Sequence, residues 1–344
     1  MYCAAHHRRQ VNPTLGEMWR GLFFMETRHK IQVLLSSLLL FFSGTIYSID
    51  RLAAQDAVNF NMTTSTRIDD RIQDIPPVLL KYLADLDQAE NYENYTTTKA
   101  EKERFYSYFQ LTPKLFQNTA NDTVIGIYFV KNFRTAGMTH YVFSDKEGLF
   151  LALIFNPEIL TTDMGKWLAY RDTSTALEDA KIRIEVDIES NFAVLLYTLV
   201  HELSHVVDIY YKAQMFPWPG LQYEKYASIL PADDVWQSFY IPKKRYDFPN
   251  RKKIRPYGLG FRISPRELIS IYKALPKYPY VSVYAAISSG EDFAETFTVC
   301  YLKEYHNLEY RVKIFYSDEL KATFTPLKSP KVRHRCQNVL HLAG

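Results

Sequence analysis

The sequence predicts an α+β fold, because segments with the composition of strands come first and two amphipathic helices follow them. The strand-like segments lie between residues 123 and 187, and the helical patterns cover residues 192–209 and 288–299. A hydrophobic content of 47% over 344 residues is ample for a folded core, in one large domain or two modest ones.

An apolar segment near the N-terminus, residues 31–47, contains no charged residue and follows Arg28 and Lys30. Its 17 residues are at the short end for a membrane span, which needs about 20. The pattern predicts a signal sequence or a membrane anchor behind a leader of residues 1–30, with the rest of the chain exported. Met25 is an alternative start that leaves a normal basic n-region, and a buried core helix is the alternative structure for the apolar segment.

Residues 48–118 are polar at first and then have a helical pattern. Pro76 and Pro77 favour a helix start, and a second helical pattern covers residues 99–109. The segment is expected to form a small helical lobe or a pro-segment, and the sequence leaves both open.

Four segments then have the β-branched and aromatic content of strands. They are residues 123–130, 139–143, 149–155 and 181–187, with a turn at 144–148 between the second and the third. They predict the small sheet of the α+β domain.

The helical pattern from residue 192 to residue 209 contains no Gly or Pro, and Ser190 or Asn191 can cap its start. A stripe of apolar residues at 3–4 spacing is expected to be buried. It consists of Leu196, Leu199, Leu203 and Val206.

This helix carries His201 and His205 four residues apart, so both imidazoles lie on one face and can bind one zinc ion. Glu202 lies about 100° further round the helix, where its carboxylate can reach a water on the metal without ligating the metal. Asp208 shares the histidine face and is expected to orient a ligand imidazole. These are the parts of a site for metal-assisted hydrolysis of a peptide bond. An ordinary helix with two histidines on its polar face is the alternative.

A zinc site of this type needs a third protein ligand. Ser288 or Ser289 can cap a helix in which Glu291 and Glu295 lie one turn apart on one face. Two carboxylates at this spacing suit one ligand and one supporting group. The alternative is an amphipathic helix whose first-turn acids are favoured by the helix dipole.

The blocks His201–Asp208 and Tyr284–Glu295 together resemble the gluzincin metallopeptidases of the anthrax lethal factor type. The resemblance covers residues 120–305 at most and is specific only in these two blocks. It implies a zincin-like metallopeptidase domain with a small sheet, an active-site helix and a ligand helix. His205 and Glu291 are 86 positions apart (291 − 205), longer than in the compact members of the family, because of an insertion.

The resemblance also implies a role for each residue of the site. One Zn²⁺ ion would be bound by His201, His205 and Glu291. Glu202 would take a proton from the water that zinc activates and pass it to the leaving amine. Tyr284 would help to hold the oxyanion and Glu295 would be a supporting residue. For Tyr284, the alternative is a packed core tyrosine.

The insertion, residues 213–280, is rich in Pro and aromatic residues. Between residues 243 and 255 it contains seven basic residues against one acid, Asp247. We expect a solvated loop there, and the alternative is a lid or an exosite for an acidic substrate or an anionic surface.

Cys300 and Cys336 either form one disulfide or remain two thiols, and Cys300 is expected to face away from the metal. Four further histidines have no partner at ligand spacing and are expected to be structural or exposed to solvent. They are His140, His306, His334 and His341.

The sequence as a whole predicts an exported zinc-dependent endopeptidase with a catalytic domain over residues 119–305 and a C-terminal extension over residues 306–344. Its partner would be a protein or peptide substrate, and residues 31–47 would provide any membrane attachment. The net charge of +3 is small for this length and gives no reason to expect nucleic acid. Two alternatives are a catalytically inactive, peptidase-like binding module and a zinc amidohydrolase that acts on cell-wall amides. The oligomeric state is left open.

Overall fold

The computed structural model describes residues 62–144, 148–188, 190–211 and 235–343. The apolar segment 31–47 lies outside the described residues, as does the part of the insertion before residue 235. In the part of the chain that is described, no helix combines the length and the apolar character that a membrane span requires.

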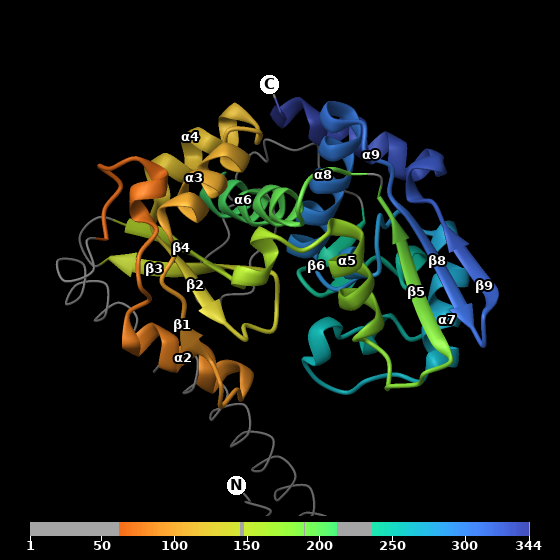
Figure 1. Ribbon diagram of the computed structural model, residues 1–344. Coiled ribbons are helices and arrows are strands. Elements are labelled where there is room, and N and C mark those ends of the chain that lie inside the picture. Colours follow the sequence, from red (N-terminus) through yellow and green to blue (C-terminus); the bar gives the residue numbers. More distant parts are fainter. Residues whose placement is uncertain (1–61, 145–147, 189, 212–234, 344) are drawn as a thin grey trace, which may run out of the picture. The chain divides into compact units, whose positions relative to one another are not determined.

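The described residues form an α+β structure (Figure 1). Its helices are α2 (Pro77–Asp87), α3 (Lys99–Phe109), α4 (Lys114–Thr123), α5 (Met164–Thr173), α6 (Leu195–Tyr211), α7 (Pro265–Ala274), α8 (Ser289–His306) and α9 (Pro330–Leu340). Its strands are β1 (Glu93–Asn94), β2 (Val124–Lys131), β3 (Gly137–Ser144), β4 (Gly148–Phe155), β5 (Ile182–Asp187), β6 (Trp236–Ser238), β7 (Ile241–Pro242), β8 (Arg311–Tyr316) and β9 (Glu319–Phe324).

The first sheet has four strands in the order β1-β2-β4-β3. Strands β2 and β4 are parallel, whereas β3 is antiparallel to β4 and forms one edge. Alternate side chains of β2 enter two different clusters of the core, so both faces of the sheet are covered. Phe129 packs with the helices α3, α4 and α6, and Tyr128 packs in the cluster with α2.

The expected fourth strand, residues 181–187, is observed as β5, but it does not belong to the first sheet. It pairs with β8, which pairs with β9, in a separate antiparallel sheet. The single sheet expected from the sequence is therefore wrong. The reason is that β8 and β9 lie in the C-terminal segment, outside the expected strands, and offer β5 a complete antiparallel partner.

Helix α6 begins at Leu195 rather than next to Ser190 or Asn191. The backbone just before it is used otherwise, because Val194 donates its N–H to the carbonyl of Thr162 and Ala193 forms a bridge with Asp163. The expected cap is therefore wrong by a few residues. The expected buried stripe of this helix is confirmed, since all four of its residues are fully buried.

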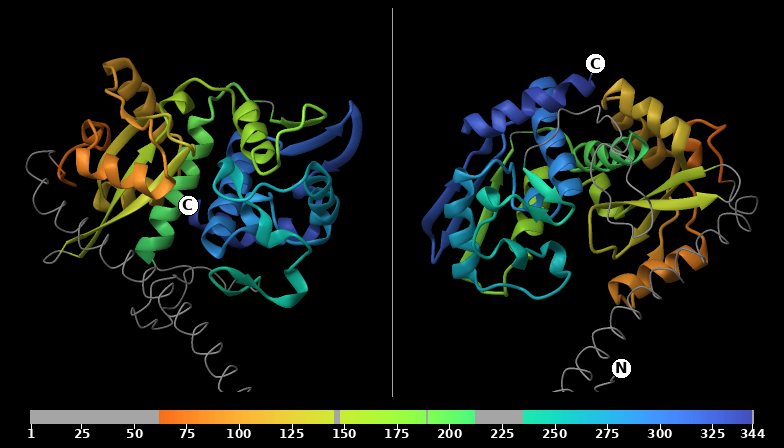
Figure 2. Two further views of the ribbon diagram at one scale, coloured as in Figure 1. Left: turned by 90° about the horizontal axis from the view of Figure 1, so that it is seen from below. Right: turned by 180° about the vertical axis from the view of Figure 1, so that it is seen from behind.

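Helix α6 runs between the first sheet and the half of the structure that contains α8, as two different views show (Figures 1 and 2). It packs against α8 on one side and against β3, α3 and α4 on the other. One large hydrophobic cluster includes Phe105 of α3, Leu199 of α6 and Val332 of α9. The expected helical lobe, catalytic domain and C-terminal extension thus share one core.

A disulfide joins Cys300 of α8 to Cys336 of α9, with the two Cα atoms 5.3 Å apart. This settles the choice between a disulfide and two thiols in favour of the disulfide. Cys300 is nine positions beyond Glu291 and faces α9, away from the helix that carries the two histidines.

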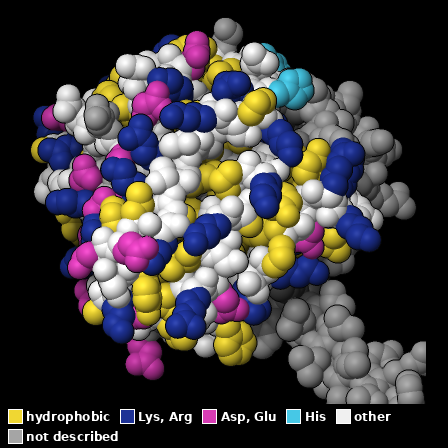
Figure 3. All heavy atoms as spheres, turned by 90° about the vertical axis from the view of Figure 1, so that its right-hand side faces the viewer, with side chains coloured by type: hydrophobic (Ala, Val, Ile, Leu, Met, Phe, Trp, Pro, Cys, Tyr) yellow, Lys and Arg dark blue, Asp and Glu magenta, His cyan; other side chains and the backbone are white. Residues whose placement is uncertain are grey.

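The face of the molecule that contains β8, β9 and α7 carries many Lys and Arg side chains (Figure 3). They alternate with apolar and acidic side chains and do not form a continuous stripe. Several of them are paired, for example Lys313 with Asp187 at 2.8 Å. The positive charge of this face is therefore partly neutralised locally.

Candidate metal centre

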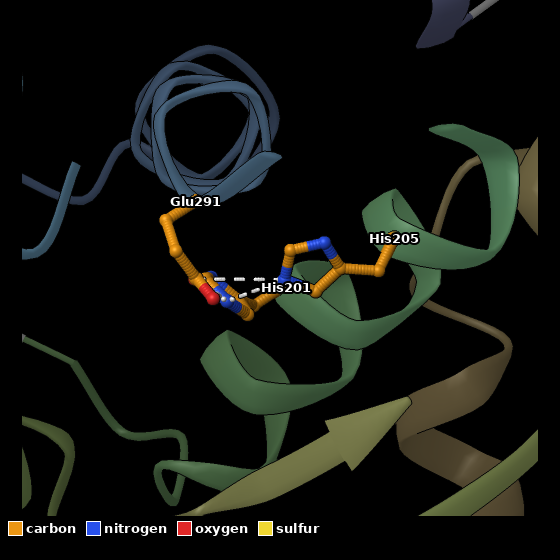
Figure 4. Close-up of side chains that lie close together, drawn as sticks. All are labelled: His201, His205 and Glu291. Carbon is orange, nitrogen blue, oxygen red and sulfur yellow. Dashed lines mark hydrogen bonds and ion pairs between the residues drawn. The ribbon is translucent and has the colours of Figure 1, made fainter. Parts of the chain in front are cut away.

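Three side chains from two helices point toward one another (Figure 4). His201 and His205 come from α6, and Glu291 comes from the first turn of α8. The Nε2 atom of His201 lies 3.2 Å from Nε2 of His205 and 3.2 Å from Oε2 of Glu291. The third side of the triangle, from His205 Nε2 to Glu291 Oε2, is 3.5 Å.

This triangle has the dimensions of one face of a tetrahedral metal site. Ligands about 2.0–2.1 Å from a tetrahedrally coordinated zinc ion are separated by about 3.3 Å from one another. Each of the three residues contributes one ligand atom to the group, so the group can hold a metal ion. Two imidazoles and one carboxylate make up a donor set that zinc accepts.

Helix α8 places Glu291 at this point because its N-cap is well defined. The side chain of Ser288 accepts a hydrogen bond from the backbone N–H of Glu291, as expected from the sequence. The apolar residues of the same helix are buried, among them Phe293 and Phe297. The helix is therefore fixed both at its start and along its apolar face.

The charges of the three residues are strongly coupled. Burial on its own would lower the pKa of His201, but hydrogen bonds with Glu291 and Glu295 outweigh it and raise this pKa to about 10. The pKa of His205 is also raised, since the attraction of Glu291 exceeds the effect of burial. The same histidines lower the pKa of Glu291 against the effect of its burial. The negative charge of Glu291 thus favours a positive charge at the point where its oxygen and the two imidazole nitrogens meet.

Glu295 lies on the far side of the His201 ring and is completely buried. Its Oε1 accepts hydrogen bonds from Arg171 Nη1 at 3.0 Å and from the hydroxyl of Tyr197 at 2.7 Å. Its Oε2 accepts one from the hydroxyl of Ser282 at 2.6 Å. Burial would raise the pKa of Glu295, but Arg171, as the largest favourable influence, together with His201 and Ser282 outweighs it and lowers this pKa to about 2.

The same Oε1 lies 3.2 Å from Nδ1 of His201. Both groups are buried, and this is the distance of an ion pair. Glu295 is thus the carboxylate in contact with Nδ1 of His201, and the supporting role expected for it stays a prediction.

Glu202 is buried beside the triangle, and β3 holds it in place. The hydroxyl of Thr139 donates a hydrogen bond to Glu202 Oε2 at 2.8 Å. A Cβ at Gly137 would lie 2.9 Å from Glu202 Cγ, so a larger residue at this point of the strand would displace the side chain of Glu202. Burial raises the pKa of Glu202, and the nearby His201 and His205 oppose that rise. A carboxylate with a raised pKa is suited to accept and return a proton.

Tyr284 is half-buried next to the same histidine, and the centroid of its ring is 5.7 Å from that of His201. The guanidinium of Arg171 lies 5.0 Å from the centre of the Tyr284 ring. Burial raises the pKa of Tyr284 well above its usual value, so the hydroxyl keeps its proton. Tyr284 therefore lies beside His201 and also packs against the core, and the role expected for its hydroxyl stays a prediction.

A small pocket opens beside these groups. Its lining includes His201, Glu202 and Tyr284 and, on its apolar side, Trp167 and Val194. Its volume is about 20 Å³, which is room for about one water molecule. A water held there would lie close to both the carboxylate of Glu202 and the imidazole of His201.

Asp208, which we expected to orient an imidazole, is buried near the start of α8. Its Oδ2 lies 3.8 Å from the position that a Cβ on Gly290 would occupy. The carboxylate that contacts the Nδ1 atom of His201 is that of Glu295. The role predicted for Asp208 stays a prediction.

Four residues of the site were not identified from the sequence: Thr139, Arg171, Tyr197 and Ser282. They come from β3, α5, α6 and the segment before α8, so no single spacing links them. Tyr197 alone carried a usable signal, because it precedes His201 by four residues and shares its face.

The basic stretch 243–255 is not simply a solvated loop. Arg251 is buried and donates to the carbonyl of Ala286 at 2.8 Å and to Asp247 at 2.7 Å. Lys253 pairs with Glu267 at 2.7 Å on the surface. Arg251 therefore anchors this stretch to the segment that carries Tyr284.

No protein-family model, no curated protein and no solved structure matches this chain.

Proposed function

We propose that this protein is a zinc-dependent endopeptidase with the zincin-like arrangement that its sequence resembles. The observation that carries the proposal is the position of Glu202 beside the triangle of His201, His205 and Glu291. A buried carboxylate next to an open triangle of ligands is the arrangement of a catalytic, rather than a structural, metal site.

Zinc is the metal that best suits this donor set, and it leaves the fourth tetrahedral position open to water or substrate. When bound, zinc supplies the acidification of water and the polarisation of the scissile carbonyl. Glu295 would hold the ring of His201, and Glu291 would contribute the negative charge that the two imidazoles lack.

The protein's own residues then move one proton and hold one developing charge. Thr139 fixes Glu202 through Oε2, so Oε1 accepts the proton of the attacking water. The same carboxylate delivers that proton to the leaving amine as the C–N bond breaks. The hydroxyl of Tyr284, which keeps its proton, donates to the developing oxyanion.

The substrate backbone would bind along β3. This strand forms an edge of the first sheet, and two of its residues, Gly137 and Thr139, contact Glu202. An exposed sheet edge binds an extended peptide by main-chain hydrogen bonds. A peptide added at this edge would pass directly over the side chain of Glu202.

Export would suit the disulfide between Cys300 and Cys336, because disulfides persist mainly in oxidising compartments. The apolar segment 31–47 would provide the route, as a cleaved signal or as an anchor.

The test compares Glu202→Gln with the wild type on a mixed peptide library. We expect one zinc ion per chain in both proteins and about a 10²–10⁴-fold lower rate of cleavage in the variant, because the proton acceptor is lost. Zinc content is measured by mass spectrometry of the metal and cleavage by mass spectrometry of the peptides. Glu304→Gln, on the exposed end of α8, is the matched control and should cleave as the wild type does.

Cleavage that survives Glu202→Gln, or a protein that binds no zinc, would contradict the proposal. Zinc binding without any peptide cleavage would favour the peptidase-like binding module. Cleavage of cell-wall amides, but not of peptides, would favour the amidohydrolase.

A further inference from the structure

A second, larger groove lies beyond the metal centre. Its volume is about 400 Å³, within the range of pockets that bind ligands. The groove is formed by the end of α5, by the segment that leads to β5 and by the loop near Tyr257. Two exposed apolar side chains belong to its lining, Tyr170 at 52% and Leu177 at 54% exposure.

Tyr257 connects this groove to the metal centre, because it lines both the groove and the small pocket beside Glu202. Ring centroids are 5.7 Å apart for His201 and Tyr284, and 6.3 Å apart for Tyr284 and Tyr257. A further 6.2 Å separates Tyr257 from Tyr170. An extended peptide advances about 3.3 Å per residue, so the groove lies within about five residues of the scissile bond.

The backbone holds Tyr257 in an unusual conformation. Its φ of 60° and ψ of 15° are left-handed, which a residue with a Cβ adopts only when its surroundings impose it. The hydroxyl of Ser174 accepts a hydrogen bond from the Tyr257 N–H at 2.6 Å, and the Tyr257 hydroxyl accepts one from Trp167 Nε1 at 3.3 Å. Tyr257 is therefore fixed as the wall between the two cavities.

The lining of the groove offers apolar surface to a ligand. Leu177, Tyr170 and Ile182 supply aliphatic and aromatic surface. Among the charged groups of the lining, Arg262 pairs with Glu178 at 3.3 Å, so its charge is partly neutralised. Apolar surface with a small number of polar groups is the usual composition of a ligand pocket.

We propose that this groove is a substrate subsite that binds an aromatic or large aliphatic side chain of the peptide, within about five residues of the scissile bond. The proposal rests on the proposed function of the metal centre. The substrate is the occupant because the groove shares Tyr257 with the pocket where cleavage would occur, and so lies within reach of a peptide bound at the metal centre.

The test uses the full chain loaded with zinc and a randomised library of peptides of about 12 residues, long enough to reach the groove from either side. Leu177→Glu places a charge in the groove at a site where the side chain is already half exposed. Leu86→Glu, at 51% exposure in α2, is the matched control. A second pair is Tyr170→Ser with Tyr305→Ser as its control, since both tyrosines are 52% exposed.

Two readouts are needed. The first is cleavage of the library, where the wild type should prefer Phe, Tyr, Trp or Leu at one fixed position. Leu177→Glu and Tyr170→Ser should each lower kcat/KM for such peptides about tenfold, and should leave peptides truncated before that position unchanged. The second is binding of the same library by immobilised, zinc-loaded Glu202→Gln, in which the same preference should disappear with Leu177→Glu.

The outcomes separate the subsite from the proposed function. Cleavage and binding that are unaffected by both groove variants overturn the subsite and leave the peptidase intact. Binding that depends on the groove, without any cleavage by the wild type, supports the groove as a peptide site and overturns the peptidase. Faster cleavage by Leu177→Glu would mean that a segment of the chain itself occupies the groove, which overturns the proposal. Absence of both cleavage and binding overturns both.

Discussion

Helix α8 carries a buried carboxylate on each of two faces, and the two differ in what they touch. Glu295 faces α6 and accepts hydrogen bonds from Arg171 and Tyr197. Asp292 faces α9 and receives both terminal nitrogens of Arg335, at 3.0 Å and 2.8 Å, as well as Nε1 of Trp236 at 2.7 Å. Both carboxylates are completely buried.

Glu295 is in contact with a residue of the metal centre, since its Oε1 lies 3.2 Å from Nδ1 of His201. Asp292 instead links α8 to α9 and β6. The disulfide from Cys300 to Cys336 also links α8 to α9. A buried carboxylate with an arginine partner can therefore belong either to a structural ion pair or to a group that supports a metal ligand. The contact with the imidazole is what separates the two.

The largest effect on stability should come from the face of α8 that carries Asp292. Arg335→Met leaves the carboxylate of Asp292 buried without its charged partner, so the free energy of unfolding should fall by about 3–5 kcal/mol. Zinc affinity of the folded protein should change by less than about twofold, because Arg335 donates to Asp292 and to the carbonyl of Pro279, which are not metal ligands. Urea unfolding measures the first and zinc titration the second. A large loss of zinc affinity in the folded variant would remove the distinction between the two faces.

His140 extends the comparison to a buried group without a charged partner. Burial lowers its pKa to about 4, and its Nε2 has no hydrogen-bond partner among the described residues. The unfolded chain therefore takes up the proton first, and stability that is present above pH 6.5 is lost as the pH falls toward 4. The loss should be about 3 kcal/mol, at about 1.4 kcal/mol for each pKa unit.

His140→Phe, which cannot take up a proton, should remove this part of the acid sensitivity. The measurement is the free energy of unfolding in urea at several pH values between 4 and 7. Equal slopes for the wild type and the variant would show that His140 is accessible to protons in the folded state.

A change on the face of α8 that carries Glu295 should alter the affinity for zinc. Glu295→Gln removes the charge that orients His201, so zinc affinity should fall by about 10–100-fold, or about 1.4–2.8 kcal/mol. Asp292→Asn is the matched control, because it neutralises an equally buried carboxylate on the same helix. Competition with a chelator measures both. If Asp292→Asn weakens zinc binding as much as Glu295→Gln, the effect is one of general stability.

The smallest effect should come from Thr139→Val, which removes the hydrogen bond to Glu202 and keeps the shape of the side chain. We expect about a tenfold lower kcat, or about 1.4 kcal/mol, with unchanged zinc affinity. The control is the same change in the Glu202→Gln background, where it should have no further effect. A full tenfold loss in that background would mean that Thr139 acts on the edge strand and not on the carboxylate.

Much of the candidate site is encoded by local spacing. His201 and His205 share a helix face because they are four residues apart, and Ser288 caps α8 because it precedes Glu291 by three. The helix of residues 99–109 and three strands of the first sheet, β2, β3 and β4, are predicted from composition within two residues, whereas β1 is not predicted. These features depend on neighbours in the chain, and such information is present in any single sequence.

What the sequence alone determined about this protein is therefore four of the eight described helices (α2, α3, α6 and α8), four of the nine described strands (β2 to β5) and the residues that can bind a metal. The tertiary structure decided the rest. It decided that β5 pairs with β8 and not with the first sheet, that Cys300 pairs with Cys336, and that Arg171 reaches Glu295 over 124 positions. The reason is physical: a buried charge or an open strand edge takes whichever partner packing brings near it, and packing is set by the whole core and not by spacing along the chain.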